Sequence, residues 1–386
     1  MNPFTFTTCN SIFCESGASR NLSEKCSSLN MSSVLIVTDQ GLIDFGLIKP
    51  IIEGIEQNSD IKVSIFSDIQ ADPPEHVVLD AVDYAKQQNI DGVIGVGGGS
   101  SMDVAKLVAA LSGNDTPIAE IYGVNQITNP RLPLIQIPTT AGTGSEVTPI
   151  SIITTGETTK AGIVSDTLLP DVAVLDAKLT VGLPSSVTAA TGVDAMVHAI
   201  EAYTSRLRKN PYSDMLAARA LELLSKNIVP AVSDGDNVSA REGMLLGAML
   251  AGQAFANAPV AAVHALAYPL GGHFHVPHGL SNSLVLPAVL EFNMPDAYQL
   301  YAELAEAIIP EGLVGSQESK AMSFLESMCK IIRDVELPPT LDKVNIPEAD
   351  LDMLAAEAML QQRLLINNPR EVTKENARKI YQSAYR

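Results

Sequence analysis

The chain has 386 residues, of which 46% are hydrophobic and 18% charged, as in a well-packed globular protein and unlike a disordered one. This length is sufficient for two domains with a sizeable core. The net charge of −19 argues against nucleic-acid binding, which requires a basic face.

The N-terminal half alternates strand-like and helix-like stretches. The opening residues lack the basic start and apolar run of a signal peptide, and a Thr/Phe-rich segment there is expected to form a hairpin. Repeated strand–helix–strand order predicts an α/β domain whose mostly parallel sheet is covered on both faces. Strands are predicted at 34–38, 61–66, 92–96, 132–138, 150–154 and 172–175, and helices at 47–53 and 75–88.

The turn after the third predicted strand carries a phosphate-binding signal. Three consecutive glycines, Gly97, Gly98 and Gly99, would let the backbone approach a phosphate closely. Ser100 and Asp103 have the spacing of a capping box, which predicts a helix whose positive end points at the glycines. Such a helix start can bind a pyrophosphate. The match to Gly-x-Gly-x-x-Gly is incomplete, so an ordinary strand-to-helix turn is the alternative.

Two further segments suit a dinucleotide. Asp39 follows the first apolar strand, where its carboxylate could bind the adenosine ribose and repel a 2′-phosphate, which favours NAD over NADP. A second glycine-containing loop at 139–146 offers backbone groups and hydroxyls for ribose, phosphate or adenine. Without other evidence this loop could equally be a polar turn. Its hydroxyl-bearing candidates are Thr139, Thr140, Thr143 and Ser145.

After residue 183 the pattern changes to helix-period segments, predicted at 185–205, 212–226 and 240–255. Residues 244–270 carry no charge and are long enough to span a bilayer, but they include polar residues and a proline. We expect two buried helices broken near 257–259, and no membrane contact. The predicted domains are therefore 1–183, which binds a dinucleotide, and 184–386, which is all-helical, with a ligand cleft between them.

The helical half contains a candidate metal site. Asp194 and His198 are four residues apart, so on a helix they share one face. Four of the six histidines lie within residues 263–279, and carboxylate with imidazole suits Fe(II) or Zn(II). An isolated pair of this kind is more often a salt bridge or a satisfied core histidine. The second histidine cluster favours a metal.

Together these motifs resemble the iron-dependent (group III) alcohol dehydrogenases, which have the dehydroquinate-synthase-like fold. The resemblance runs from the turn at 38–41 to residues 368–373. Its strongest parts are Gly97–Ser100 with Asp103 and Lys106, residues 138–146, residues 192–198, and His264 with residues 277–279.

By this resemblance the metal ligands and catalytic residues would be Asp194, His198, His264 and His278. Four protein ligands would fill a tetrahedral site, so the ion must accept a fifth ligand, which Fe(II) does readily and zinc can also do. Glu201 is expected to support a ligand instead of binding the metal. His273 and His275 would flank the cleft. Tyr268 stands where many relatives carry a second histidine. Lys160, which lies between two predicted strands, joins the cofactor-binding set.

The implied activity is hydride transfer between a short alcohol or diol and NAD, with the metal activating the alcohol oxygen as a Lewis acid. The implied protein is a cytoplasmic homodimer. The four cysteines fit a reducing cytosol, because they show neither metal-type nor disulfide-framework spacing. The predicted cleft lining is Val147, Pro149, Ile150, Phe255 and Leu266.

Several alternatives share the pattern. Glycerol-type dehydrogenases and hydroxyacid–oxoacid transhydrogenases have the same fold, whereas maleylacetate reductases are disfavoured because the ligand set is complete. A dehydroquinate-synthase-like lyase would require several basic residues for a sugar phosphate, and few lie near the histidines. A metallohydrolase without a cofactor would leave both glycine loops unexplained.

Overall fold

The computed structural model describes residues 3–57, 60–156, 159–309 and 312–385. The chain divides into two compact units. The α/β unit comprises Thr7–Thr140 and Gly144–Val181. The helical unit comprises the segment that ends at Phe6, the short stretch Ala141–Thr143, and the chain from Gly182 onward.

A six-stranded sheet forms the centre of the α/β unit. The strand order is β1-β9-β6-β4-β2-β3, and every neighbouring pair is parallel. The predicted fold class is therefore confirmed. The strands are β1 (Ser11–Cys14), β2 (Ser33–Val37), β3 (Lys62–Phe66), β4 (Gly92–Gly97), β6 (Leu134–Pro138) and β9 (Val172–Leu175).

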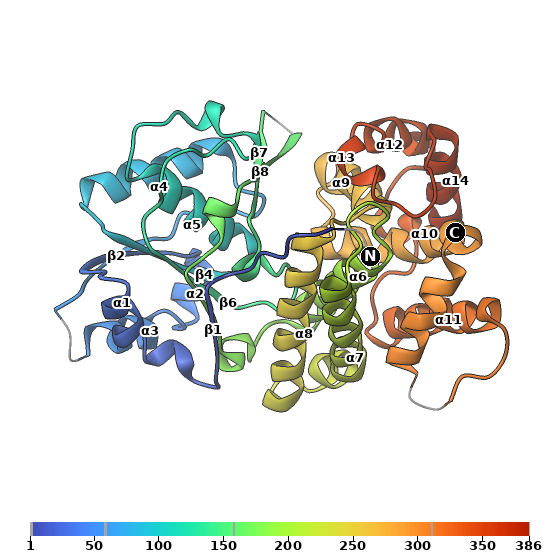
Figure 1. Cartoon of the computed structure of the whole chain (residues 1–386), viewed down its shortest axis with the longest axis horizontal. Coiled ribbons are helices and arrows are strands. Elements are labelled where there is room, and N and C mark those ends of the chain that lie inside the picture. Colours follow the sequence, from blue (N-terminus) through green and yellow to red (C-terminus); the bar gives the residue numbers. More distant parts are fainter. Residues whose placement is uncertain (1–2, 58–59, 157–158, 310–311, 386) are drawn as a thin grey trace. The chain divides into compact units, whose positions relative to one another are not determined.

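Helices cover both faces of this sheet (Figure 1). Side chains alternate along a strand, so Leu35 and Val37 pack in one buried cluster with α4 and α5, whereas Val34 and Ile36 pack with α1 and α3. Continuous apolar runs suit strands that are buried on both faces. The helices are α1 (Ser23–Ser28), α2 (Gln40–Asp44), α3 (Lys49–Glu56), α4 (Glu75–Gln87) and α5 (Gly99–Leu111).

A second sheet has the order β5-β8-β7, with β5 parallel to β8 and β7 antiparallel to it. Its strands are β5 (Gly123–Val124), β7 (Ile150–Thr155) and β8 (Thr159–Val164), of which β5 and β8 were not predicted. Short 3₁₀ turns lie at Ala18–Arg20, Ile118–Glu120, Ser145–Val147, Asp166–Leu168, Ala177–Thr180, Leu341–Val344 and Glu348–Asp350.

The predicted N-terminal hairpin is wrong. The only strand in the first twenty described residues is β1, and it pairs in parallel with β9, Ser11 opposite Val172. The partner of this strand lies far along the chain, so a local pattern of Thr and Phe could not identify it.

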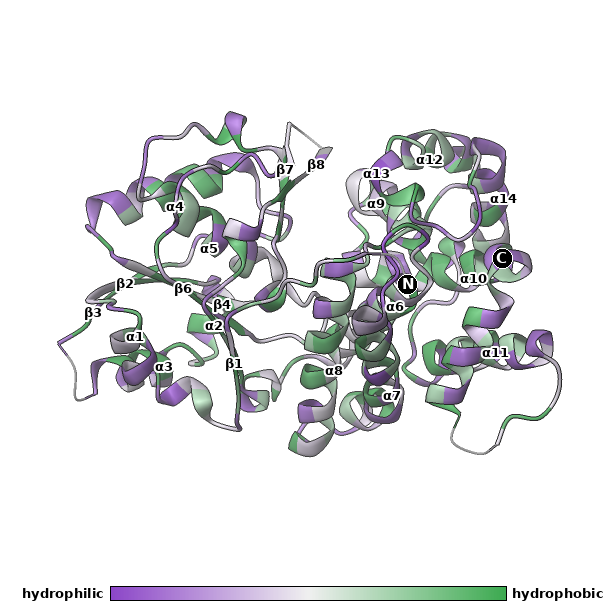
Figure 2. Ribbon diagram, viewed as in Figure 1, coloured by the Kyte–Doolittle hydropathy of each residue, from purple (hydrophilic) through white to green (hydrophobic). Residues whose placement is uncertain are grey.

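The helical unit contains nine α-helices among its described residues. Most residues of α6 and α8 are buried, and α7 carries both polar and apolar residues along its length (Figure 2). The helices are α6 (Ser185–Thr204), α7 (Pro211–Ser233), α8 (Val238–Asn257), α9 (Ala262–Phe274), α10 (His278–Ile308), α11 (Gln317–Asp334), α12 (Leu351–Ala358), α13 (Gln362–Leu365) and α14 (Lys374–Tyr385).

The uncharged segment 244–270 forms the later part of α8 and most of α9, which confirms two mostly buried helices separated by a break after Asn257. Within the described parts of the chain, no single helix combines the length and apolar composition of a membrane span. This pair meets that criterion only when the two helices are taken together, and they are bent by 106° at the break.

Candidate active site

Helix α6 supplies the first two members of a cluster of metal-type ligands. Asp194 and His198 lie one turn apart on the same face, and Asp194 Oδ1 is 4.0 Å from His198 Nε2. Both side chains are buried because almost the whole of this helix lies in the interior. A carboxylate buried in this way requires positively polarised or hydrogen-bonding neighbours.

Helices α9 and α10 bring two more imidazoles to the same carboxylate oxygen. Asp194 Oδ1 lies 3.8 Å from His264 Nε2 and 3.7 Å from His278 Nε2. The start of α10 approaches α6 closely because residue 279 is glycine: a Cβ there would lie 2.4 Å from the Ala190 carbonyl oxygen. Side-chain bulk at this position would therefore push His278 away from Asp194.

These four residues fit one divalent ion. Bonds to nitrogen and oxygen ligands are about 2.1 Å long, so two ligands of one ion lie at most about 4.2 Å apart. The three distances from Asp194 Oδ1 satisfy this limit. All four donor atoms lie within 4.8 Å of one another, so binding would require only small shifts. One carboxylate and three imidazoles form a set suited to Fe(II) and Zn(II).

Glu201, one turn after His198 on α6, orients one of these imidazoles. Its Oε2 lies 2.6 Å from His264 Nδ1, and its Oε1 accepts a 2.7 Å hydrogen bond from the Val263 backbone N–H. A carboxylate can only accept, so His264 Nδ1 carries the proton and Nε2 presents its lone pair to the cluster. Glu201 therefore has the supporting position that the sequence predicted.

Asn282 is a further member of the site, and sequence reasoning missed it. Its Nδ2 donates to Asp194 Oδ1 at 2.6 Å and lies 3.4 Å from His264 Nε2 and 3.3 Å from His278 Nε2. Asn282 is one turn after His278 on α10 and is fully buried. That i,i+4 spacing was the only signal available in the sequence.

The electrostatics of the cluster suit a cation. Burial lowers the pKa of His198 to about 3, so its imidazole is neutral. Burial alone would raise the pKa of Asp194, but the three imidazoles and the Asn282 amide lower it overall, so it is ionised. Burial likewise opposes a charge on His264, whereas Glu201 raises its pKa overall. The cluster therefore presents the ionised Asp194 carboxylate beside the neutral His198 imidazole.

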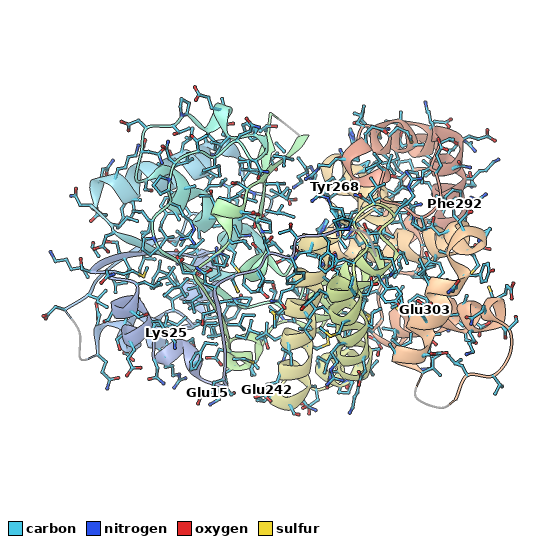
Figure 3. The ribbon with its side chains drawn as sticks, in the orientation of Figure 1. Glu15, Lys25, Glu242, Tyr268, Phe292 and Glu303 are labelled. Atoms are coloured by element: carbon cyan, nitrogen blue, oxygen red, sulfur yellow. The ribbon has the colours of Figure 1, made fainter. Side chains whose placement is uncertain are left out.

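One side of the cluster is open. The His278 side chain is 40% exposed, whereas those of Asp194, His198 and His264 are at most 6% exposed. Tyr268 lies near this open member, with ring centroids 6.0 Å apart, and is labelled in Figure 3. The exposed histidines at 273 and 275 lie outside the cluster, as predicted.

The predicted cleft lining is partly wrong. Phe255 stacks on His198 with ring centroids 4.3 Å apart, so it does lie beside the cluster. Val147 and Leu266 are completely buried, so they expose no surface to a ligand. Both are apolar residues in core positions, which composition cannot distinguish from residues that line a cleft.

The glycine turn lies at the carboxyl edge of the six-stranded sheet. Strand β4 ends at Gly97, whose φ of 151° is a backbone conformation that glycine adopts more readily than other residues. A Cβ at this position would also lie 2.6 Å from Ser101 Oγ. Helix α5 starts at Gly99, directly after Gly98, so its free N–H groups adjoin the turn. This is the arrangement that binds phosphates.

Other predicted cofactor residues gather at the same edge. Asp39 follows β2, and its Oδ2 lies 3.6 Å from the position of a Cβ on Gly97. Thr139 follows β6 and donates its N–H to the Gly97 carbonyl at 2.9 Å, and Thr140 Oγ1 lies 3.7 Å from a Cβ position on Gly98. In doubly wound sheets, dinucleotides bind at this edge.

The predicted capping box is wrong. The N-cap of α5 is Gly98, with no side-chain cap, and Ser100 is already inside the helix. Asp103 turns away to accept hydrogen bonds from Ser145 Oγ at 2.6 Å and from Ile152 N at 2.8 Å. Asp103 and Ser145 are thus engaged with each other, and direct cofactor contact by either stays a prediction.

The two remaining predicted cofactor residues lie elsewhere. Lys160 is in β8, where its ammonium pairs with the Asp72 carboxylate. Thr143 belongs to the short stretch that clusters with the helical unit. Their roles in cofactor binding also stay predictions.

Comparison with known proteins places both units in one family. Residues 9–177 match the model for iron-containing alcohol dehydrogenases, and residues 188–385 match the C-terminal model of the Fe-containing alcohol dehydrogenase family. Long-chain-alcohol dehydrogenase 1 of Geobacillus thermodenitrificans is 40% identical over 372 residues, which cover 96% of this chain and 93% of that protein.

Solved structures agree with these matches. The crystal structure of a 1,3-propanediol oxidoreductase has a TM-score of 0.96 and 33% identity, and the match covers 100% of both chains. A sulfoacetaldehyde reductase from Bifidobacterium kashiwanohense, solved in complex with NAD+, has a TM-score of 0.88 and 28% identity, covering 100% of this chain and 99% of that one.

Proposed function

Because the chain belongs to the iron-containing alcohol dehydrogenase family, we propose that it transfers a hydride between a short alcohol or diol and NAD at an ion held by Asp194, His198, His264 and His278. The match to this family favours a dehydrogenase over the alternative, a dehydroquinate-synthase-like lyase. The observation that carries the proposal is the convergence of three imidazole nitrogens on Asp194 Oδ1.

A divalent ion held by Asp194, His198, His264 and His278 would act as a Lewis acid toward an alcohol oxygen. The protein's own contribution is to fix the ligands. Glu201 holds the His264 tautomer, and Asn282 holds one oxygen of Asp194. Phe255 packs over His198 and shields the buried side of the cluster from water, whereas the exposed face of His278 leaves access for a substrate.

For the cofactor, the proposed seat is the carboxyl edge of the six-stranded sheet. The N–H groups at the start of α5 would bind the pyrophosphate beside Gly97–Gly99 and Ser100. The Asp39 carboxylate would accept hydrogen bonds from the adenosine ribose. The nicotinamide supplies the hydride acceptor. NAD is supported by the NAD+ complex of the related sulfoacetaldehyde reductase.

The substrate class is the least constrained part of the proposal. Related proteins are named for 1,3-propanediol and for long-chain alcohols, so chain length varies among them. We favour short alcohols and diols. The deciding assay measures kcat/KM for a panel of primary alcohols, diols and aldehydes with NAD and with NADP. A protein that reduces no aldehyde with either cofactor would refute the proposal.

We further propose that residues 1–183 bind the dinucleotide and residues 184–386 bind the metal and substrate. The proposed setting is the cytoplasm, where a reducing environment suits cysteines that form no disulfide among the described residues, as is the case for Cys9, Cys14, Cys26 and Cys329. The family resemblance favours a homodimer, which light scattering of the purified protein would test.

A further inference from the structure

Lys106 is a completely buried lysine in the middle of α5, the helix that starts at the glycine turn. Its ammonium has three N–H donors, and it makes three hydrogen bonds: to Ser145 Oγ at 2.8 Å, Thr148 Oγ1 at 3.1 Å and the Ile150 carbonyl at 2.6 Å. A buried ammonium is costly unless it is satisfied in this way.

A carboxylate on the same face of α5 strengthens this network. Asp103 lies one turn before Lys106, with its Oδ1 3.7 Å from Nζ, and accepts hydrogen bonds from Ser145 Oγ and the Ile152 N–H. Burial lowers the pKa of Lys106 to about 8, and Asp103 and Glu146 oppose that shift, so the ammonium is mostly charged at neutral pH. The charged form is the one that makes all three bonds.

The network fixes one end of the second glycine loop. At the other end, Thr139 donates its N–H to the Gly97 carbonyl. Between these two attachments lie Thr140 and Thr143, two of the hydroxyl-bearing residues assigned to the cofactor. Gly144, with φ of 62°, then turns the chain into the 3₁₀ segment that carries Ser145. The loop is therefore attached to the glycine turn at its start and to the body of α5 at its end.

We propose that Lys106 is a positioning residue for the dinucleotide: it holds the loop from Thr139 to Thr148 in the conformation that binds the cofactor beside the start of α5. This inference rests on the proposed function. Lys106 itself touches no reacting atom, because its three donors are all used within the protein.

The test measures NADH binding by fluorescence titration of the metal-loaded full-length protein. Lys106→Met keeps the length of the side chain and removes the ammonium. We expect the Kd for NADH to rise by at least about tenfold, the consequence of losing roughly 1.4 kcal/mol of binding free energy. KM for NAD should rise with it, whereas kcat at saturating NAD should stay close to that of the wild type. Kd values are compared at equal metal content, because a Cβ at Gly142 of this loop would lie 2.7 Å from Thr191 Cβ on α6, the helix that carries Asp194 and His198.

Lys86→Met is the matched control. Lys86 also belongs to a helix of the α/β unit, but its ion pair with Asp115 is exposed, so its replacement should change neither Kd nor metal content. Thr148→Val serves as a milder second variant, because it removes one acceptor of Lys106 and keeps the shape of the side chain. We expect the Kd for NADH to rise about threefold. In the double variant Lys106→Met/Thr148→Val, the change in binding free energy should be smaller than the sum of the two single changes.

The outcomes separate the inference from the proposed function. Folded Lys106→Met or Thr148→Val protein that binds NADH as tightly as wild type would overturn the positioning role, as would a lowered Tm with unchanged Kd. If Lys106→Met does not fold, Thr148→Val decides. Wild-type protein that binds no NADH would overturn the proposed function itself.

Discussion

Glu201 Oε2 lies 2.6 Å from His264 Nδ1, inside a buried site where both side chains are almost inaccessible to water. The carboxylate fixes the ring so that Nε2 faces Asp194. Glu201→Gln removes the charge that favours this tautomer, and we expect metal affinity to fall by about 10- to 100-fold. Competition with a chromogenic chelator measures this affinity directly.

The control for that variant is Glu306→Gln. Glu306 lies on α10 in the same unit, but it pairs with Lys320 on the surface and should leave metal affinity unchanged. Equal affinities for wild type and Glu201→Gln would show that Glu201 only packs against α9.

Cofactor preference should depend on Asp39. A carboxylate after β2 is expected to favour NAD and to repel a 2′-phosphate, so kcat/KM should be higher with NAD than with NADP. Asp39 also caps α2 by accepting the Leu42 N–H at 3.1 Å, and Asn can replace it as a cap. Asp39→Asn should therefore lower the ratio of kcat/KM with NAD to kcat/KM with NADP by about tenfold, which corresponds to ~1.4 kcal/mol in the relative barrier. The stability of the protein should not change.

Asp39→Gly removes both the carboxylate and the side-chain cap of α2. It should reduce the preference for NAD over NADP and also lower Tm. A wild-type protein that prefers NADP would show that this carboxylate does not meet the ribose.

Glu146 should make stability depend on pH. Burial raises the pKa of this carboxyl to about 7, against its ordinary value of 4.5, although a backbone hydrogen bond and the charge of Lys106 oppose the shift. The folded state therefore favours the protonated form, so the stabilisation is complete below about pH 4.5 and is lost as the pH rises through 7. The loss should be on the order of 3 kcal/mol.

Glu146→Gln removes this titration. Urea unfolding at pH 5 and pH 8 should show the variant gaining stability relative to wild type at the higher pH. A difference between the two proteins that is the same at both pH values would mean that Glu146 is not buried in its protonated form.

Tyr268 should not be essential. Its ring centroid lies 6.0 Å from that of His278, but an ordinary phenol, with a pKa of ~10, is a poor proton shuttle at neutral pH. Tyr268→Phe should keep kcat within about tenfold of the wild-type value, which corresponds to a change of at most ~1.4 kcal/mol in the activation barrier. Loss of a thousandfold at unchanged metal content would assign the phenol a direct part in the chemistry.

The local pattern of the sequence was sufficient for most of the sheet. Runs such as residues 34–38 and 92–96 are apolar on both faces and end at Asp39 and the glycines, so strands and the cofactor edge could be predicted together. Strand β8 was missed because its sequence, TKAGIV, has only a short apolar run and includes Lys160. Pairing of β1 with β9 depends on contacts between distant residues.

The candidate site was predictable where helix spacing carries the information. Asp194 and His198 share a face by the i,i+4 rule, whereas the approach of α9 and α10 is a property of the tertiary packing. Asn282 was missed because an asparagine in a helix has many possible roles. The engagement of Asp103 with Ser145 was missed because the capping-box spacing offered a simpler local explanation.

The most direct test of the account is metal dependence. Wild type, His264→Ala, His278→Ala and, as a control, His273→Ala would be purified, and metal content, circular dichroism and alcohol oxidation measured on each. We predict that both cluster variants stay folded but lose metal and turnover, that His273→Ala resembles wild type, and that chelation abolishes wild-type activity until Fe(II) or Zn(II) is restored. Full dehydrogenase activity in wild-type protein that has been stripped of metal would contradict the account.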